Sequence, residues 1–296
     1  LIKFQINKDN KLKDIRISFA NTEVKLNNIE SSIRGNPLID TSRYNTFQKI
    51  FKGTRDEEAN ILLLPENALP YQLLSTLIKF STDNSIMSVS GLEHWKVNNY
   101  CFNFIVTILP VTVNSIKDAV VIIRLKNHYA PEEKELIRSE HFYYPKPIKY
   151  RYDLINWRNL YFSPFYCFEL ADSVHRSMFK SKVDLLIASE WNKDTPYFSN
   201  IVEALSRDIH AYIAQVNTSQ YGDSRLTKPS SSATKDILKL KGGKNDTVLI
   251  GEINLKSLRT FQRKNYNQTK DDKEFKPLPP NYNYKNAIKR ERNENI

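Results

Sequence analysis

The chain has 296 residues, a mass of 34.6 kDa and a formal net charge of +11. Hydrophobic residues make up 40% of it, and 16 Tyr and 15 Phe add apolar area, so we expect one large globular domain. No apolar run approaches the roughly 20 residues that cross a bilayer, and no signal peptide is visible, which points to the cytoplasm. The two cysteines fit a reducing compartment.

Apolar β runs alternate with amphipathic helices along the chain, and this alternation predicts an α/β fold. We expect strands over residues 14–24, 59–65, 85–92, 100–110, 119–125, 160–168, 183–189, 211–218 and 246–255. We expect helices over residues 43–58, 70–82, 131–138, 169–179 and 197–210. Polar segments 228–245 and 269–284 are expected to be loops or a mobile tail. We therefore expect a domain over 1–255 and a basic tail, forming an interface or partly disordered, over 256–296.

Three apolar β runs, far apart in the sequence, end on residues that a cysteine-based amide hydrolase would need. These residues are Glu66, Lys126 and Cys167. A polar residue at the end of an apolar strand lies at the rim of the sheet, where ligands bind in open α/β folds. We therefore expect the three side chains to share one pocket, about 3 to 5 Å apart.

Each of these residues also has a simpler interpretation. A free cysteine beside aromatic residues, such as Cys167, is often only a small buried hydrophobe, and we interpret Cys101 in that way. Glu66 follows a proline and can stabilise a helix N-terminus, and Lys126 can be a solvated strand end. Three such coincidences in a suitable order are less plausible than one shared site.

The three motifs resemble those of the carbon–nitrogen hydrolase (nitrilase) superfamily. The matching segments are Leu63-Leu-Pro-Glu66, Lys126-Asn-His128 with Pro131 and Glu133, and Cys167-Phe-Glu169, and weaker echoes extend the resemblance over residues 12–255. The resemblance implies a four-layer αββα sandwich with a Glu-Lys-Cys triad. The chain departs from the family pattern in its scarce glycines, only 7 in all, and in the bulky residues around the cysteine.

The chemistry follows from the residue types. A cysteine thiol has a reference pKa of about 8.5, so it needs a base, Glu66, to become a nucleophile. Lys126 and the backbone N–H of Phe168 would hold the oxyanion that forms. By resemblance, Glu133 would orient the substrate or the attacking water. Glu133 can equally be a carboxylate that stabilises a helix N-terminus, and Glu132 is its competitor. We assign supporting roles to Glu169 and His128.

The predicted function is hydrolysis of a non-peptide C–N bond, in an amide, carbamoyl compound or nitrile, through a Cys167 thioester. The alternative is an oligomerisation or regulatory module of a larger protein, such as a reverse-transcriptase-linked antiviral defence protein. We expect no cofactor and no metal, because the five histidines are scattered and no Cys-x-x-Cys, His-Glu-x-x-His, dinucleotide-binding or phosphate-binding loop occurs.

Two kinds of macromolecular partner are expected besides a small amide or nitrile substrate. Family members commonly pair through outer helices and C-terminal tails, so we expect a homodimer or higher homo-oligomer, with residues 275–284 lying on a partner subunit. The net charge is spread over the whole chain, and a solvated surface explains most of it. If nucleic acid binds, we expect it at the basic segments 259–264 and 289–292 or at a fused domain.

Overall fold

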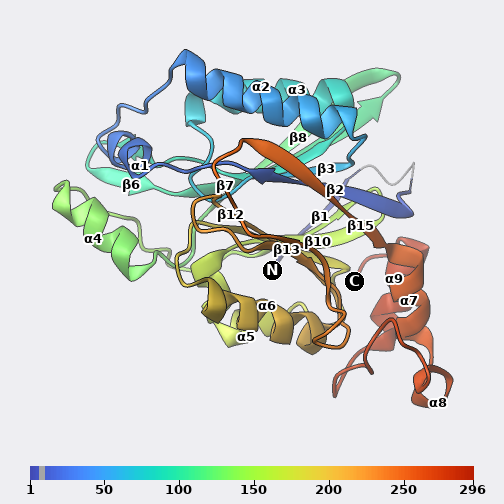
Figure 1. The fold of residues 1–296 in the computed structure, drawn as a ribbon. Helices are drawn as coiled ribbons and strands as arrows, with labels where there is room; N and C mark the ends of the chain where they lie inside the picture. Colours follow the sequence, from blue (N-terminus) through green and yellow to red (C-terminus); the bar gives the residue numbers. More distant parts are fainter. Residues whose placement is uncertain (7–10) are drawn as a thin grey trace.

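The computed structural model describes residues 1–6 and 11–296 of the chain. Two β-sheets lie face to face, and helices cover the outer face of each sheet (Figure 1). The expected α/β fold, a four-layer αββα sandwich, is therefore confirmed.

Each sheet combines parallel and antiparallel strands. Among the described residues, one sheet has six strands in the order β15 (Thr247–Asn254), β2 (Asp14–Asn21), β3 (Ile61–Leu63), β4 (Met87–Gly91), β7 (Phe104–Val113) and β8 (Ile116–Leu125). The other has seven in the order β1 (Ile2–Ile6), β9 (Asp153–Trp157), β10 (Leu160–Tyr166), β11 (Leu185–Glu190), β12 (Tyr212–Asn217), β13 (Ser224–Thr227) and β14 (Asp236–Leu240). A separate small ribbon pairs β5 (Trp95–Val97) with β6 (Tyr100–Phe102).

The helices form the outer layers and close the two ends of the sandwich. Helix α2 (Thr41–Asp56) and helix α3 (Leu74–Asn84), which follows the short 3₁₀ helix η1 (Tyr71–Leu73), cover the six-stranded sheet. Helices α5 (Ser173–Ser177) and α6 (Thr195–Ile209) cover the seven-stranded sheet. Figure 1 shows α1 (Leu26–Ile33) and α4 (Pro131–Ser139) at one end, and α7 (Leu255–Arg263), α8 (Tyr266–Thr269) and α9 (Tyr284–Arg292) at the other.

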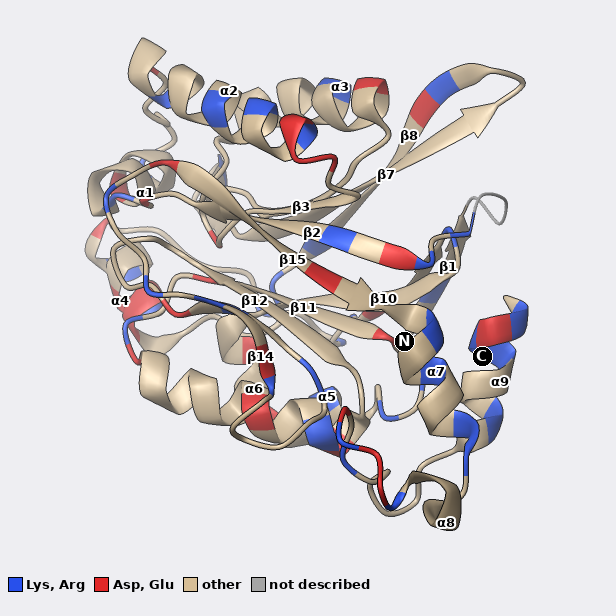
Figure 2. Ribbon diagram, turned by 45° about the vertical axis from the view of Figure 1, so that its right-hand side comes forward, with Lys and Arg blue, Asp and Glu red and all other residues tan. Residues whose placement is uncertain are grey.

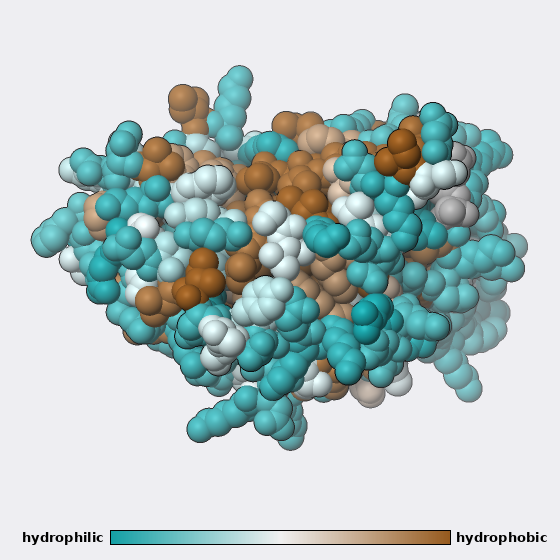
Figure 3. Space-filling model, turned by 90° about the horizontal axis from the view of Figure 1, so that it is seen from above, coloured by the Kyte–Doolittle hydropathy of each residue, from teal (hydrophilic) through white to brown (hydrophobic). Residues whose placement is uncertain are grey.

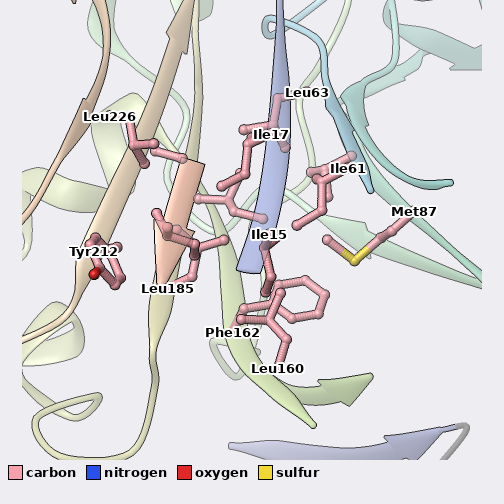
Figure 4. Packing of buried hydrophobic residues seen from close by; sticks show 14 of the residues in the cluster. Ile15, Ile17, Ile61, Leu63, Met87, Leu160, Phe162, Leu185, Tyr212 and Leu226 are labelled. Atoms are coloured by element: carbon pink, nitrogen blue, oxygen red, sulfur yellow. The ribbon is translucent and has the colours of Figure 1, made fainter. Parts of the chain in front are cut away.

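The layers follow from the alternation of side chains along each strand. In β3, Ile61 and Leu63 point into the core between the sheets, whereas Leu62 packs with the residues under α2 and α3. In β11, Leu185 likewise points between the sheets, whereas Leu186 packs under α6. Figure 4 shows the core between the sheets, where side chains from both sheets meet. Because these strands are apolar on both faces, they are held in fixed positions, and their ends form a rigid rim.

The C-terminal segment packs on the protein's own chain. Lys and Arg are frequent on α7 and α9 (Figure 2), yet Arg259 and Arg290 are buried and both bind Asp184, at 2.6 and 2.9 Å. Phe275 is 3% exposed and stacks edge to face on Phe261. The expectation that residues 275–284 lie on a partner subunit is therefore wrong for Phe275, whose burial is supplied by its own chain.

Several predicted elements differ from the observed ones. The strand expected over 160–168 ends at Tyr166, and Cys167 begins a 3₁₀ helix, η2 (Cys167–Ala171). The helix expected over 169–179 is interrupted at Asp172, because its side chain accepts the backbone N–H groups of Val174 and His175 and starts α5.

Other differences concern segments whose sequence signals are weak. The strand expected over 100–110 is divided between β6 and β7, and the loop expected over 228–245 contains β14. The sequence interpretation missed β1, β5, β9, β13, α1, α7, α8 and α9. These elements have only three to nine residues each, too few for a periodic pattern to be distinctive, so their positions depend on packing rather than on local pattern.

The outer surface has an apolar patch over the helices of the six-stranded sheet. Figure 3 shows this face, on which hydrophobic side chains gather in the middle and polar side chains surround them. On the edge strand β8, Ile123 lies on the outer face and Val120 on the opposite face, and each is 37% exposed. No helix in the described part of the chain is long and apolar enough to cross a membrane.

Candidate active site

Glu66, Lys126 and Cys167 lie together at the ends of β3, β8 and β10. The Cys167 thiol donates to Glu66 Oε2 at 3.5 Å, and Lys126 Nζ donates to Glu66 Oε1 at 2.6 Å. All three residues are almost fully buried, at 2%, 1% and 6% exposure for Glu66, Lys126 and Cys167. The structure thus brings the three side chains together, with Glu66 in contact with the other two.

Glu133 lies on the other side of Lys126, whose Nζ donates to Glu133 Oε2 at 2.5 Å. The side-chain NH₂ group of Asn103 donates a hydrogen bond to each carboxylate, at 2.9 Å for Glu66 and 2.7 Å for Glu133. His94 Nε2 is 3.0 Å from Glu133 Oε1. The structure thus brings Glu133 into the site, whereas Glu132 is exposed and pairs with Lys193 at 3.6 Å. The sequence analysis missed His94, which lies three residues beyond the end of β4, as Glu66 lies three residues beyond the end of β3.

The backbone of Glu66 is fixed by close packing between the sheets. The N–H of Glu66 donates to the carbonyl of Glu190 at 3.3 Å, which ties the end of β3 to the end of β11. Gly91 lies against the same segment, where a Cβ atom would stand 2.6 Å from the Cα of Glu66. Any side chain at Gly91 would therefore displace Glu66, so glycine is required by the close approach and not by its backbone angles.

Glu169 joins the segments that carry Lys126 and Cys167. Its carboxylate accepts two hydrogen bonds from Arg124, both at 2.7 Å, in a fully buried pair. The same carboxylate accepts the backbone N–H of Asn127 at 2.7 Å and that of Tyr166 at 3.0 Å. Glu169 thus contacts both segments from the 3₁₀ helix η2 and through Arg124, rather than from the start of the regular helix expected over 169–179.

The two carboxylates of the site differ in acidity although they share one lysine. Burial raises the pKa of Glu66, Lys126 opposes this, and the negative charge of Glu133 raises it further. Burial also disfavours the ionised form of Glu133, but Lys126 and His94 outweigh it and hold the pKa of Glu133 below its usual range. Burial likewise lowers the pKa of Lys126, but Glu133 and Glu66 outweigh it, so the ammonium stays charged. Glu133 is therefore a permanent anion, and Glu66 is the group able to exchange a proton.

The thiol of Cys167 rests in its protonated form. Burial raises its pKa well above the usual value, and the charge of Glu66 raises it further. Lys126 and a hydrogen bond from the backbone N–H of Trp191 lower this pKa without reversing the balance. A neighbouring residue, Glu190, is buried too, and burial raises its pKa to about 8, so its carboxyl is largely protonated at neutral pH. The sequence interpretation missed Glu190, whose place just after the apolar run of residues 185–188 was the available signal.

A cavity of about 300 Å³ opens onto Cys167 and Lys126. Aromatic side chains form one part of its wall: Phe168, Trp191, Phe198 of α6 and Tyr221 of the turn before β13. Phe168, directly after Cys167, lies on this wall. The cavity can hold a small acyl group against the nucleophile. Polar side chains outside the triad also line it, among them Asn67, Asn192 and Asp194.

His128 lies away from the cavity. Its ring packs on Tyr150, with 4.3 Å between the ring centroids, and 6.0 Å separates it from the ring of His175. Its Nε2 atom is 3.8 Å from Asp172 Oδ2. The expectation that the histidines are scattered is thus wrong for His128 and His175, which η2 and α5 bring together.

Searches with the sequence alone find no matching family model and no matching curated protein. The fold, however, is that of carbon–nitrogen hydrolase superfamily proteins of known structure. One is a superfamily protein of Xanthomonas campestris with an arsenic adduct in its active site; it is 11% identical, with a TM-score of 0.60 over 85% of this chain and 94% of that chain.

A second similar structure is the amidase of Nesterenkonia sp. AN1. A variant carrying the acetamide moiety of fluoroacetamide on its active-site cysteine is 12% identical, with a TM-score of 0.58 over 82% of this chain and 91% of that chain. Another variant, in complex with butyramide, is 14% identical, with the same TM-score over 88% and 97%. At these identities the similarity establishes the fold, and function must be argued from the site itself.

Proposed function

We propose that the protein is a carbon–nitrogen hydrolase that cleaves a non-peptide C–N bond through a thioester on Cys167. One observation carries the proposal: the two oxygens of Glu66 bind the thiol at 3.5 Å and the Lys126 ammonium at 2.6 Å. A base, a fixed positive charge and a nucleophile are thus in contact beside a cavity. The Nesterenkonia amidase, with its covalent adduct on the active-site cysteine and its complex with butyramide, supports the same reaction class.

The first half of the cycle forms the thioester. Glu66 takes the thiol proton while the sulfur of Cys167 attacks the carbonyl carbon of an amide, which produces a tetrahedral oxyanion. The Lys126 ammonium and the backbone N–H of Phe168 hold this oxyanion, and loss of one such donor typically costs about 3 kcal/mol. Glu66 then gives its proton to the nitrogen, the C–N bond breaks, and the amine leaves.

The second half releases the acid. Water attacks the thioester carbon while Glu66 takes one of its protons, and the tetrahedral oxyanion forms again at the same donors. When it collapses, the C–S bond breaks and Glu66 returns the proton to Cys167. The permanent negative charge of Glu133 keeps Lys126 charged and in place throughout the cycle. Another amine in place of water would turn the same cycle into acyl transfer.

The test is intact-mass spectrometry of the full chain after incubation with small amides, butyramide among them, and rapid acid quenching. We expect one acyl group per chain and release of ammonia, both lost in Cys167→Ala. Cys101→Ser is the matched control, since Cys101 is the other thiol and is buried in the core away from the cavity. A folded wild-type protein that releases no ammonia from any amide or nitrile and carries no acyl group would refute the proposal.

A further inference from the structure

A second cluster of chemically active side chains lies outside the cavity. It consists of His128, Asp172 and His175, none of which lines the cavity. His128 belongs to the segment that follows Lys126, whereas Asp172 and His175 belong to the segment that follows Cys167. The cluster therefore joins the two chain segments that leave the candidate active site.

The donor atoms of the cluster face one another. His175 Nδ1 is 2.5 Å and His128 Nε2 is 3.8 Å from the same oxygen, Asp172 Oδ2, and the three atoms lie within 4.8 Å of one another. A tetrahedral zinc ion with bonds of about 2.0 to 2.2 Å needs its ligand atoms about 3.4 Å apart. Side-chain adjustments on the order of 1 Å would bring all three atoms to one ion.

The carboxylate of Asp172 is held in the orientation that such an ion requires. Its Oδ1 atom accepts the backbone N–H groups of Val174 and His175, at 3.0 and 3.1 Å. This leaves Oδ2 directed at the two imidazole rings. The N-cap residue of α5 therefore presents its second carboxylate oxygen to the two histidines.

The His128 ring has an unused nitrogen on this side. Its Nε2 atom is buried and has no hydrogen-bond partner among the described residues, because the 3.8 Å separation from Asp172 is too long. A buried polar atom without a partner is costly, and a bound ion removes that cost. The rings of Tyr150 and Tyr152 pack on His175, with 5.2 and 5.1 Å between the ring centroids. Tyr150 also packs on His128, so both imidazole rings are held in place by aromatic neighbours.

We propose that His128, Asp172 and His175 bind a divalent transition-metal ion, with Zn²⁺ as the expected ion. Two imidazole nitrogens and one carboxylate oxygen are a ligand set that zinc prefers, and water can take the fourth position because the side chains are partly exposed. The ion links the segment after Lys126 to the segment after Cys167. Its function is to hold these two segments together, because it does not face the cavity, and the proposal does not depend on the proposed hydrolase activity.

Calorimetric titration of Zn²⁺ into the full chain, freed of metal by a chelator and then dialysed, tests the proposal. A Cys167→Ala background removes the accessible thiol, which could itself bind zinc. We expect one Zn²⁺ per chain, and a melting temperature that rises with zinc concentration. Co²⁺ should give the visible spectrum of a four-coordinate site without sulfur ligands.

Variants of the cluster identify the ligands. His175→Ala should raise the dissociation constant for Zn²⁺ at least about 100-fold, since loss of even an outer-shell partner costs 10 to 100-fold. Asp172→Asn retains a side-chain oxygen that can cap α5, so its fold should survive while zinc binding weakens. His141→Asn is the matched control, because His141 lies outside the cluster. Binding below one equivalent, or equal binding by all folded variants, would overturn the proposal.

Discussion

Glu133→Gln is the substitution that tests the electrostatics of the site most directly. Lys126 Nζ contacts Glu66 at 2.6 Å and Glu133 at 2.5 Å, so the bound carboxylate oxygens are no more than about 5 Å apart. At an effective dielectric constant of about 20, two unit charges at that distance interact by about 3 kcal/mol. This energy corresponds to about two pKa units.

The direction of the change follows from the role of Glu66 as a base. Activity falls at low pH when Glu66 becomes protonated, and the negative charge of Glu133 raises the pKa of Glu66. Removing that charge lowers the pKa of Glu66, so the acid limb of the pH profile of kcat/KM should move down by about two units. The rate on the plateau should fall as well, because Lys126 loses one of its two carboxylate partners.

The assay is ammonia release from an amide substrate, measured over a range of pH for the wild type and for Glu133→Gln. Glu132→Gln is the matched control, because the Glu132 side chain is 74% exposed and water screens its charge, so its acid limb should not move. The NH₂ group of the new glutamine would face hydrogen-bond donors, so hydrogen bonds that the carboxylate accepted would be lost. We therefore also expect the free energy of unfolding to fall by about 1 to 3 kcal/mol. A folded Glu133→Gln protein with an unmoved acid limb would refute this account of the two carboxylates.

Four further outcomes are expected. Cys167→Ala, folded and correctly assembled, should lose its native biological activity; full activity would favour the scaffold interpretation over the hydrolase. Arg124→Met should cost about 3 to 5 kcal/mol in urea denaturation, because it leaves Glu169 buried and unpaired. Burial opposes the ionisation of Asp184, but its two arginines hold its pKa below the usual range. This pairing therefore stabilises the fold above about pH 4, and the stabilisation is lost as the pH falls through the lower pKa of Asp184 in the folded state. In Asp184→Asn, the free energy of unfolding should therefore change less with pH on the acid side. Light scattering should give a dimer or larger assembly through the apolar patch of Figure 3, and a monomer at micromolar concentration would contradict this.

The position of the site was predictable because strand ends are marked in the sequence. Glu66 and Cys167 each follow a run of buried, mostly apolar residues, and Lys126 follows the β-branched run of β8, which is only partly buried. Such runs indicate both a strand and its rim. His94 and Glu190 also follow β runs, but without a partner in view a buried His or Glu cannot be told from a solvated one. Their importance comes from contacts across the two sheets, which a local pattern does not contain.

The C-terminal segment shows a second limit of the sequence. Charged residues are frequent in α7 and α9, so these helices are expected to be solvated, yet Arg259 and Arg290 are buried because Asp184 pairs with both. The residues next to an arginine in the sequence do not show whether it pairs with a distant aspartate or is exposed to solvent. The same holds for His128 and His175, which only the turn at Asp172 brings together.

The carboxylate of Glu169 also has a consequence for how the site can change in evolution. It accepts hydrogen bonds from the guanidinium of Arg124 and from the backbone N–H groups of Asn127 and Tyr166. Exchanging the two charges, with glutamate at 124 and arginine at 169, would preserve the ion pair but turn donors toward the two N–H groups. The two charges of this ion pair therefore cannot be exchanged while the backbones beside Lys126 and Cys167 keep their positions. A related sequence can lose the pair or replace it with other residues, but it cannot place the acid at 124 and the base at 169.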